Sequence, residues 1–222
     1  GWSSDVCSSD LQVDLNNRKY ISYDDAQNQK YFEHNYLGTD SIDKTKRTSI
    51  KNTIGIALQE GFNKWAKAGL TAFLSYEYRN FALTDTTNIP GQRIINNYKE
   101  SSLSIGGELS KKQGKLLHYN ILGELAIAGE DAGQFSVEGR GDLNLRLFGD
   151  TVRLDVNAFI KNQNPVFYFR HFQSKHYWWD NNDLSKIMRT RLEGKLSLDR
   201  WGTQLRAGVE KDRKSTRLNS SH

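Results

Sequence analysis

Apolar and polar residues alternate with a period of two along most of the chain after residue 50. In the segment FSVEGRGDLNLRL, residues 135–147, the odd positions carry Phe, Val, Leu or Gly, and the even positions carry Ser, Glu, Arg, Asp or Asn. Successive side chains of a β-strand point to opposite faces, so this pattern predicts a strand with one apolar face and one charged face.

Seven other segments repeat the pattern, and together they predict an all-β protein with at least eight strands. The predicted strands cover residues 50–59, 67–79, 101–110, 117–128, 135–147, 151–161, 188–198 and 203–211. Every second connection is predicted to be short, namely 60–66, 111–115, 148–150 and 199–202. The other connections comprise a modest loop at 129–133 and two long loops at 81–97 and 161–183.

Three features favour a membrane barrel over a soluble sandwich. Strands of about 10 to 13 residues suit a tilted membrane crossing better than an ordinary strand. Short turns at one end and long loops at the other are typical of outer-membrane barrels. Aromatic residues that suit a membrane interface lie at the strand ends, with Trp65 and Trp201 at one rim and Tyr76, Tyr78 and Phe135 at the other.

The sequence therefore predicts a transmembrane antiparallel up-and-down β-barrel. Closure of the barrel would leave no backbone group unpaired in hydrocarbon, where each unpaired group costs several kcal/mol. The apolar face would contact lipid, and the charged face would line a water-filled lumen.

Charge and hydropathy exclude two other classes. The chain has a formal net charge of +5 and a pI near 9.2, but its basic residues alternate with acids, so no nucleic-acid partner is predicted. The mean hydropathy is −0.71, and no run of about 20 apolar residues exists, which argues against membrane-spanning helices. No hydrolytic triad or G-x-S-x-G motif is present, so neither an enzyme nor a cofactor is predicted.

The two ends of the chain, GWSSDVCSSDL and DRKSTRLNSSH, are polar and show no apolar period. With suitable codons, WSSDVCSSD and RKSTRLNSS are translations of opposite strands of one short DNA. We therefore interpret residues 1–11 and 212–222 as non-native scars and not as disordered tails. Residues 12–47 are then a partial strand and long-loop region, and residues 48–211 are a segment of a β-barrel whose parent has more strands.

Two stretches carry a resemblance to a known family. NTIGIALQEGFNKWAKAGLTAFLSYEYRNFAL (52–83) and NPVFYFRHFQSKHYWWDNN (164–182) resemble the putative porin family of Gram-negative outer-membrane β-barrels. The resemblance implies an integral protein of the bacterial outer membrane that acts as a channel and has no catalytic residues. Its partners would be outer-membrane lipid and small hydrophilic solutes, and a homo-oligomer is compatible with it.

The candidate pore residues are the charged residues of the polar strand positions. Opposed acids and bases across a constriction would filter solutes by charge and size, or they would simply brace the wall by cross-strand pairing. The predicted lumen-facing residues are Glu77, Arg79, Glu108, Glu124, Glu138, Arg140, Asp142, Arg146, Arg153, Asp155, Arg189, Arg191, Glu193, Lys195 and Arg206.

The aromatic loop FYFRHFQSKHYWWDNND offers three interpretations. His171 and His176 stand five residues apart, a spacing that suits neither a helix nor one strand face, so no metal site is predicted with Asp180 and Asp183. A metal site is thus the first and least favoured interpretation. In the second, which we prefer, the aromatic rings of the loop pack on one another at the mouth of the barrel. In the third, the loop binds sugar, and its ligand candidates are Tyr177, Trp178, Trp179 and Asp180.

Three functions are compatible with these patterns. The first is an outer-membrane porin that lets small hydrophilic solutes diffuse through a charged lumen. The second is the barrel of a TonB-dependent-type transporter, which would need a plug domain before the barrel. The third is a soluble or surface β-protein that binds carbohydrate through the tryptophan-rich loop.

Overall fold

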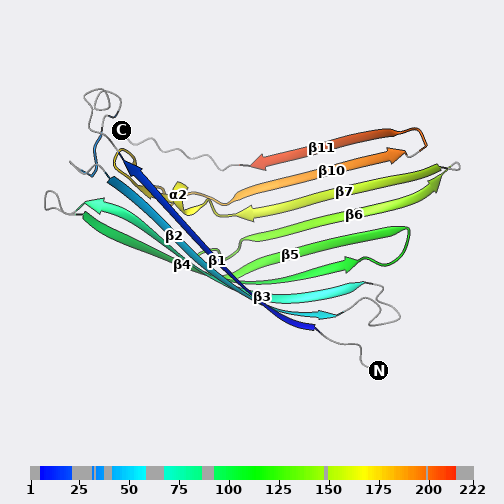
Figure 1. Ribbon diagram of the computed structural model, residues 1–222, viewed down its shortest axis with the longest axis horizontal. Coiled ribbons are helices and arrows are strands. Elements are labelled where there is room, and N and C mark those ends of the chain that lie inside the picture. The colour runs from blue at the N-terminus through cyan, green and yellow to red at the C-terminus, as the bar shows by residue number, and fades with distance from the viewer. Residues whose placement is uncertain are drawn as a thin grey trace.

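The structure is a computed structural model that describes residues 6–21, 32, 34–37, 42–58, 68–86, 93–147, 150–198 and 200–213. It confirms the all-β, up-and-down class, because neighbouring strands of its main sheet follow one another along the chain and pair antiparallel, apart from the short β8 and β9, which pair only with each other (Figure 1). The nine-stranded sheet runs in the order β1 (Val6–Ile21), β2 (Ile42–Leu58), β3 (Gly69–Thr86), β4 (Arg93–Lys111), β5 (Leu117–Gly129), β6 (Phe135–Leu147), β7 (Asp150–Gln163), β10 (Ile187–Leu198) and β11 (Thr203–Arg213).

The register keeps apolar residues together on one face of the sheet, which we call the outer face. Ile54 lies opposite Leu74, Leu74 lies opposite Ile105, and Ile105 lies opposite Leu125. Because side chains alternate along each strand, the intervening polar residues share the opposite face, which we call the polar face. A one-residue slip of any pair would mix the two faces, so the alternation in the sequence specifies the register.

Burial in this sheet is inverted relative to a soluble protein. Large apolar side chains on the outer face are exposed, with Ile54 at 57% and Leu192 at 56% of their full accessibility. On the polar face the strands bury polar groups instead, among them Ser49, Ser75 and Ser102. A water-soluble monomer rarely leaves so continuous an apolar surface uncovered.

Three strands are longer than the sequence predicts, and the predicted long loop at 81–97 is wrong. β2, β3 and β4 contain 17, 18 and 19 residues, and the ladder between β3 and β4 continues to the pair Thr86–Arg93. The link between them is therefore only residues 87–92. The extended parts are largely polar on the outer face and carry Phe81 and Leu83 on the other face, so the regular alternation is lost before the strand ends, whereas backbone pairing does not depend on side-chain polarity.

β1 also differs from the expected partial strand in residues 12–47. It pairs with β2 along its whole length, from Val6 opposite Ala57 to Ile21 opposite Ile42. β1 thus begins inside the segment 1–11, which we interpret as non-native. Since most residues can join a ladder through their backbone, the pairing does not test that interpretation, which stays a prediction.

The links between strands divide into two sets at opposite ends of the sheet. Residues 22–41, 87–92, 130–134 and 164–186 connect strands at one end, called the loop end, and residues 59–68, 112–116, 148–149 and 199–202 connect strands at the other, called the turn end. The two longest links lie at the loop end. Within the described ranges, β1 and β11 each pair with one neighbour, and no pairing joins them to each other.

The link between β7 and β10 has structure of its own, which the sequence pattern does not predict. It contains the short helix α2 (Phe167–Arg170) and the strands β8 (His171–Gln173) and β9 (Trp178–Asp180), which pair with each other. A small apolar cluster joins this link to the sheet, since Phe167 packs with Phe81 and Leu83 of β3. Within the described residues, no helix has the length and apolar character that a membrane crossing requires.

Candidate functional site

The polar face holds all of the predicted lumen-facing residues. The register aligns Glu77 with Ser102, Glu124 with Ser136, and Lys195 with Arg206. Every ion pair between described residues of the nine-stranded sheet also lies on this face, including Arg47–Asp14 at 3.1 Å and Arg189–Glu210 at 2.9 Å. That the face lines a water-filled pore stays a prediction.

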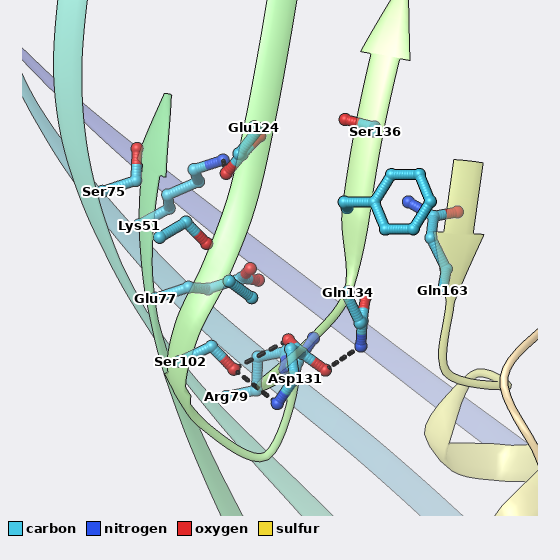
Figure 2. Close-up of a pocket in the computed structure, with 13 residues that line it drawn as sticks. Lys51, Ser75, Glu77, Arg79, Ser102, Glu124, Asp131, Gln134, Ser136 and Gln163 are labelled. Carbon is cyan, nitrogen blue, oxygen red and sulfur yellow. Dashed lines mark hydrogen bonds and ion pairs between the residues drawn. The ribbon is translucent and has the colours of Figure 1, made fainter. Parts of the chain in front are cut away.

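A hollow of about 210 Å³ lies on the polar face across β2 to β7 (Figure 2). Its wall is built from polar groups that are held by one another. The Ser49 hydroxyl donates a 2.8 Å hydrogen bond to Glu77 Oε1, and Lys51 Nζ lies 3.6 Å from Glu124 Oε1. Figure 2 shows Lys51 and Glu124 pointing toward each other across the hollow. Such a wall presents fixed charges and hydroxyls to any solute that enters.

Arg79 and Asp131 stand at the loop-end edge of this hollow. Arg79 Nη2 lies 2.6 Å from Asp131 Oδ2 and 3.2 Å from Glu100 Oε2. Asp131 also accepts hydrogen bonds from the Ser102 hydroxyl at 2.7 Å and from Gln134 Nε2 at 2.5 Å. Glu100 and Asp131 are both only 8% exposed, so these partners offset the cost of removing their carboxylates from water.

Arg170 extends this ion network into the link that contains α2. Its guanidinium contacts Glu100 Oε1 at 2.5 Å and Glu130 Oε1 at 2.7 Å, and its Nε donates to the Pro165 carbonyl at 3.1 Å. Glu100 is thus shared between Arg79 of the sheet and Arg170 of the link. A second hollow, of about 390 Å³, lies on the other side of this network and is lined by Phe81, Phe167 and Tyr168 among others. The network therefore separates two hollows on one face.

Aromatic packing holds α2 against the polar face. The rings of Phe167 and Phe81 stack with centroids 4.0 Å apart and an interplanar angle of 11°. Tyr168 packs edge-on against Phe81 at 5.5 Å, and burial raises the pKa of its phenol, so the hydroxyl is neutral at pH 7. These contacts, together with Arg170, fix the link by both apolar and ionic interactions.

The loop ligand candidates do not form one surface. Tyr177 and Trp178 are exposed, whereas Trp179 stacks on Phe172 at 4.8 Å and donates from Nε1 to the Tyr168 carbonyl at 2.9 Å. Asp180 is exposed, and its Oδ1 lies 3.5 Å from His171 Nδ1. Trp179 therefore packs the link, and sugar binding through the remaining exposed groups stays a prediction.

The two histidines of the loop lie in different surroundings. His176 stacks on Phe32 at 4.0 Å, and its Nδ1 lies 3.2 Å from the His34 carbonyl, while His171 packs on Tyr98 at 4.3 Å. Within the described part of the chain, no three His, Cys, Asp or Glu side chains are grouped as a metal site requires.

The predicted residues nearer the turn end line a third, more open hollow of about 710 Å³. Arg140, Asp142, Asp155, Glu193, Lys195 and Arg206 line it. Glu193 is held by Arg191 at 2.7 Å and by Arg206, and Asp142 is held by His118 at 2.7 Å. Outside this hollow, Glu108 accepts from Asn120, Glu138 pairs with Lys161 at 2.5 Å, and Arg153 donates to Asn144 at 3.0 Å. Arg146 is exposed.

The rim aromatics are placed as follows. Tyr76 and Tyr78 lie on the outer face, where apolar residues give way to Asn80 toward the loop end. Phe135 pairs with Leu125 and also lines the polar hollow. Trp201 is exposed in the turn between β10 and β11, and Trp65 lies outside the described residues.

Sequence reasoning missed four members of the site: Lys51, Glu100, Asp131 and Arg170. Lys51 and Glu100 follow the alternation of their strands and would have been found if the strand faces had been traced fully along β2 and β4. Asp131 and Arg170 lie in links, where no period exists and only the fold brings them to Arg79 and Glu100.

Fold and charge distribution together define the β-barrel class, in which an up-and-down sheet separates an apolar face from a charged face. Within that class, the chain belongs to the putative porin family, which it matches over residues 6–213. No curated protein and no solved structure matches the chain.

Proposed function

We propose that the chain forms the wall of an outer-membrane porin, through which small hydrophilic solutes diffuse passively. The observation that carries this proposal is the inverted burial of the sheet, with exposed Ile54 and Leu192 on one face and ion pairs on the other. Membership of the porin family supports the same function and the location in a bacterial outer membrane.

Bilayer physics explains why both faces are needed. Hydrocarbon accepts the apolar outer face and requires every backbone group to be paired, which an antiparallel sheet provides once it closes. Fixed charges on the polar face are solvated only if water fills the enclosed space. Opposed acids and bases such as Lys51 and Glu124 then lie along the path of the solute.

The link that contains α2 supplies the selective element of the proposed pore. It folds against the polar face at the loop end, and Arg170 ties it to Glu100 and Glu130. A link held over the lumen narrows the passage and places guanidinium and carboxylate groups on both sides of it. Passage would then depend on solute size and charge and not on a chemical step.

Planar-bilayer recording and liposome permeation test the function. The full-length protein, with any strands that complete the barrel, should require detergent, show heat-modifiable gel mobility, produce stepwise conductance, and admit small sugars while excluding large ones. A full-length protein that stays monomeric and folded in water without detergent, or that inserts but neither conducts nor admits sugars, would overturn the proposal.

A further inference from the structure

The outer face carries positive charge near the loop end, and the porin function alone does not explain why it lies there. On β1 to β4, the charged residues at outer-face positions are all basic, and apart from Arg93 at the loop-end tip of β4 they are lysines. Lys19, Lys44, Lys46 and Lys99 lie toward the loop end, and Lys111 lies at the turn end. Among these described outer-face residues there is no Asp or Glu.

The four loop-end lysines are neighbours in the register. Lys19 lies directly opposite Lys44, and Lys46 lies two residues further along β2 on the same face. Lys99 reaches the group from β4, because it pairs with Asn80, which in turn pairs with Thr48 of β2. Like charges directly opposite each other destabilise a sheet unless something of opposite charge lies between them.

Nothing within the described residues neutralises these lysines. All four are exposed, and none of their side chains makes an ion pair with a described residue. The basic side chains of the polar face behave differently, since Arg47 contacts Asp14 and Lys51 contacts Glu124. These four ammonium groups are therefore open to an anionic group from outside the chain.

Their height above the apolar band identifies those surroundings. The continuous band ends at Ile50 of β2 and Leu103 of β4, and Lys46 and Lys99 each lie four residues beyond it. Beyond the lysines, only the separate isoleucines Ile21 and Ile95 are described as large apolar residues exposed on this face of β1 to β4. Four residues span about 14 Å along a strand, and a tilt of about 40° reduces this to roughly 10 Å of height. Lysine side chains also reach several ångströms toward the interface. The ammonium groups then lie at the level of lipid head groups, just outside a hydrocarbon core about 30 Å thick.

We propose that Lys19, Lys44, Lys46 and Lys99 form a lysine belt that binds anionic, phosphate-bearing lipid head groups in the leaflet at the loop end. The proposal rests on the proposed function, because it requires the outer face to contact lipid. Head-group phosphates would neutralise the Lys19–Lys44 pair and hold the long strands β2 to β4 at a fixed depth. A soluble anionic protein fits less well, because the belt adjoins the apolar band that lipid must cover.

Lipid selectivity measured with spin-labelled lipids tests the belt. The chain is inserted into phosphatidylcholine vesicles, and the fraction of motionally restricted label is compared for phosphatidylglycerol and phosphatidylcholine. A lysine near an anionic surface contributes on the order of fivefold in binding, so the chain should prefer phosphatidylglycerol severalfold. The variant Lys44→Gln/Lys46→Gln/Lys99→Gln should lose most of this preference. Added salt should also weaken the preference in the unmodified chain.

A matched control removes the same charge at the opposite rim. The variant Lys111→Gln/Lys112→Gln/Lys115→Gln changes three lysines at the turn end and should keep the preference. Equal preference in all three proteins, or equal loss in both variants, would overturn the belt. Conductance in pure phosphatidylcholine separates the two proposals: normal conductance without lipid preference overturns the belt alone, whereas failure to insert overturns the porin function and the belt with it.

Discussion

Two neighbouring residues of β10, Arg191 and Leu192, show what each face of the sheet requires. Leu192 lies on the outer face near the middle of its strand, between Ala158 and Val209 of the adjacent strands. Arg191 lies on the polar face, where its guanidinium contacts Glu193 at 2.7 Å. Their side chains thus face environments of opposite polarity although they are adjacent in the sequence.

Exchanging polarity at these two positions should have unequal effects. Leu192→Arg places a charge in hydrocarbon near the bilayer centre and should cost roughly 2–4 kcal/mol of folding free energy. Arg191→Leu should leave the fold nearly intact, because Arg206 still contacts Glu193, and should change ion preference instead. Urea unfolding in lipid vesicles measures the first effect and reversal potentials measure the second. Equal destabilisation at both positions would contradict the assignment of the faces.

Residue-level prediction from the sequence succeeds where a side chain follows the strand period. All the charged residues assigned to the lumen side fall on one face, because alternation alone determines which face a strand residue occupies. Asp131 and Arg170 have no such constraint. Their roles depend on how the links fold back onto β3 and β4, and that is tertiary information.

At the scale of elements, the link between β7 and β10 combines irregular structure with both apolar and ionic contacts to the sheet. Helix α2 contains two phenylalanines with opposite environments, since Phe167 is 7% exposed and Phe169 is 63% exposed. Phe167 stacks on Phe81 of β3, while Phe169 faces away from the cluster. The pair offers a matched comparison within one turn of helix.

Phe167→Ala should release the link from the polar face. Truncation of a buried phenylalanine typically costs roughly 3–5 kcal/mol. Here the loss should weaken the contact between the link and the polar face more than it weakens the sheet itself. We expect faster proteolysis within residues 164–186 and a larger, noisier conductance. Phe169→Ala serves as the control and should change neither. Unchanged proteolysis and conductance in Phe167→Ala would show that the link does not narrow the passage.

The elements themselves were only partly predictable. Alternation located β2 to β7, β10 and β11, because each has a continuous apolar side. It missed the loop-end parts of β2, β3 and β4, where pairs such as Asn80–Lys99 are polar on the outer face. It also missed α2, β8 and β9, because each element is too short for a period to be recognised. These three elements are held in place by tertiary contacts of Phe167, Arg170 and Trp179 instead.

At the scale of the whole molecule, the edges of the sheet raise the main question of assembly. β1 and β11 each have one side without a ladder partner in the described part of the chain. In hydrocarbon such an edge costs several kcal/mol for each unpaired backbone group. In water it would be an open template for pairing with another chain.

We predict that both edges are paired when the chain is in a membrane, with each other or with strands of further chains. Amide hydrogen exchange in lipid nanodiscs should protect β1 and β11 about as well as the central strands β5 and β6. Exchange in a detergent-free denaturant serves as the unprotected reference. Fast exchange along either edge strand, while β5 and β6 stay protected, would contradict closure.

The side-by-side alignment of Ile54, Leu74, Ile105 and Leu125 has a consequence for how the molecule assembles. In the extended chain these residues are far apart, so no single segment is apolar enough to partition into the membrane by itself. A continuous apolar surface forms only when neighbouring strands pair. Membrane insertion and strand pairing must therefore proceed together, and a partly paired intermediate would expose apolar surface that is prone to aggregation.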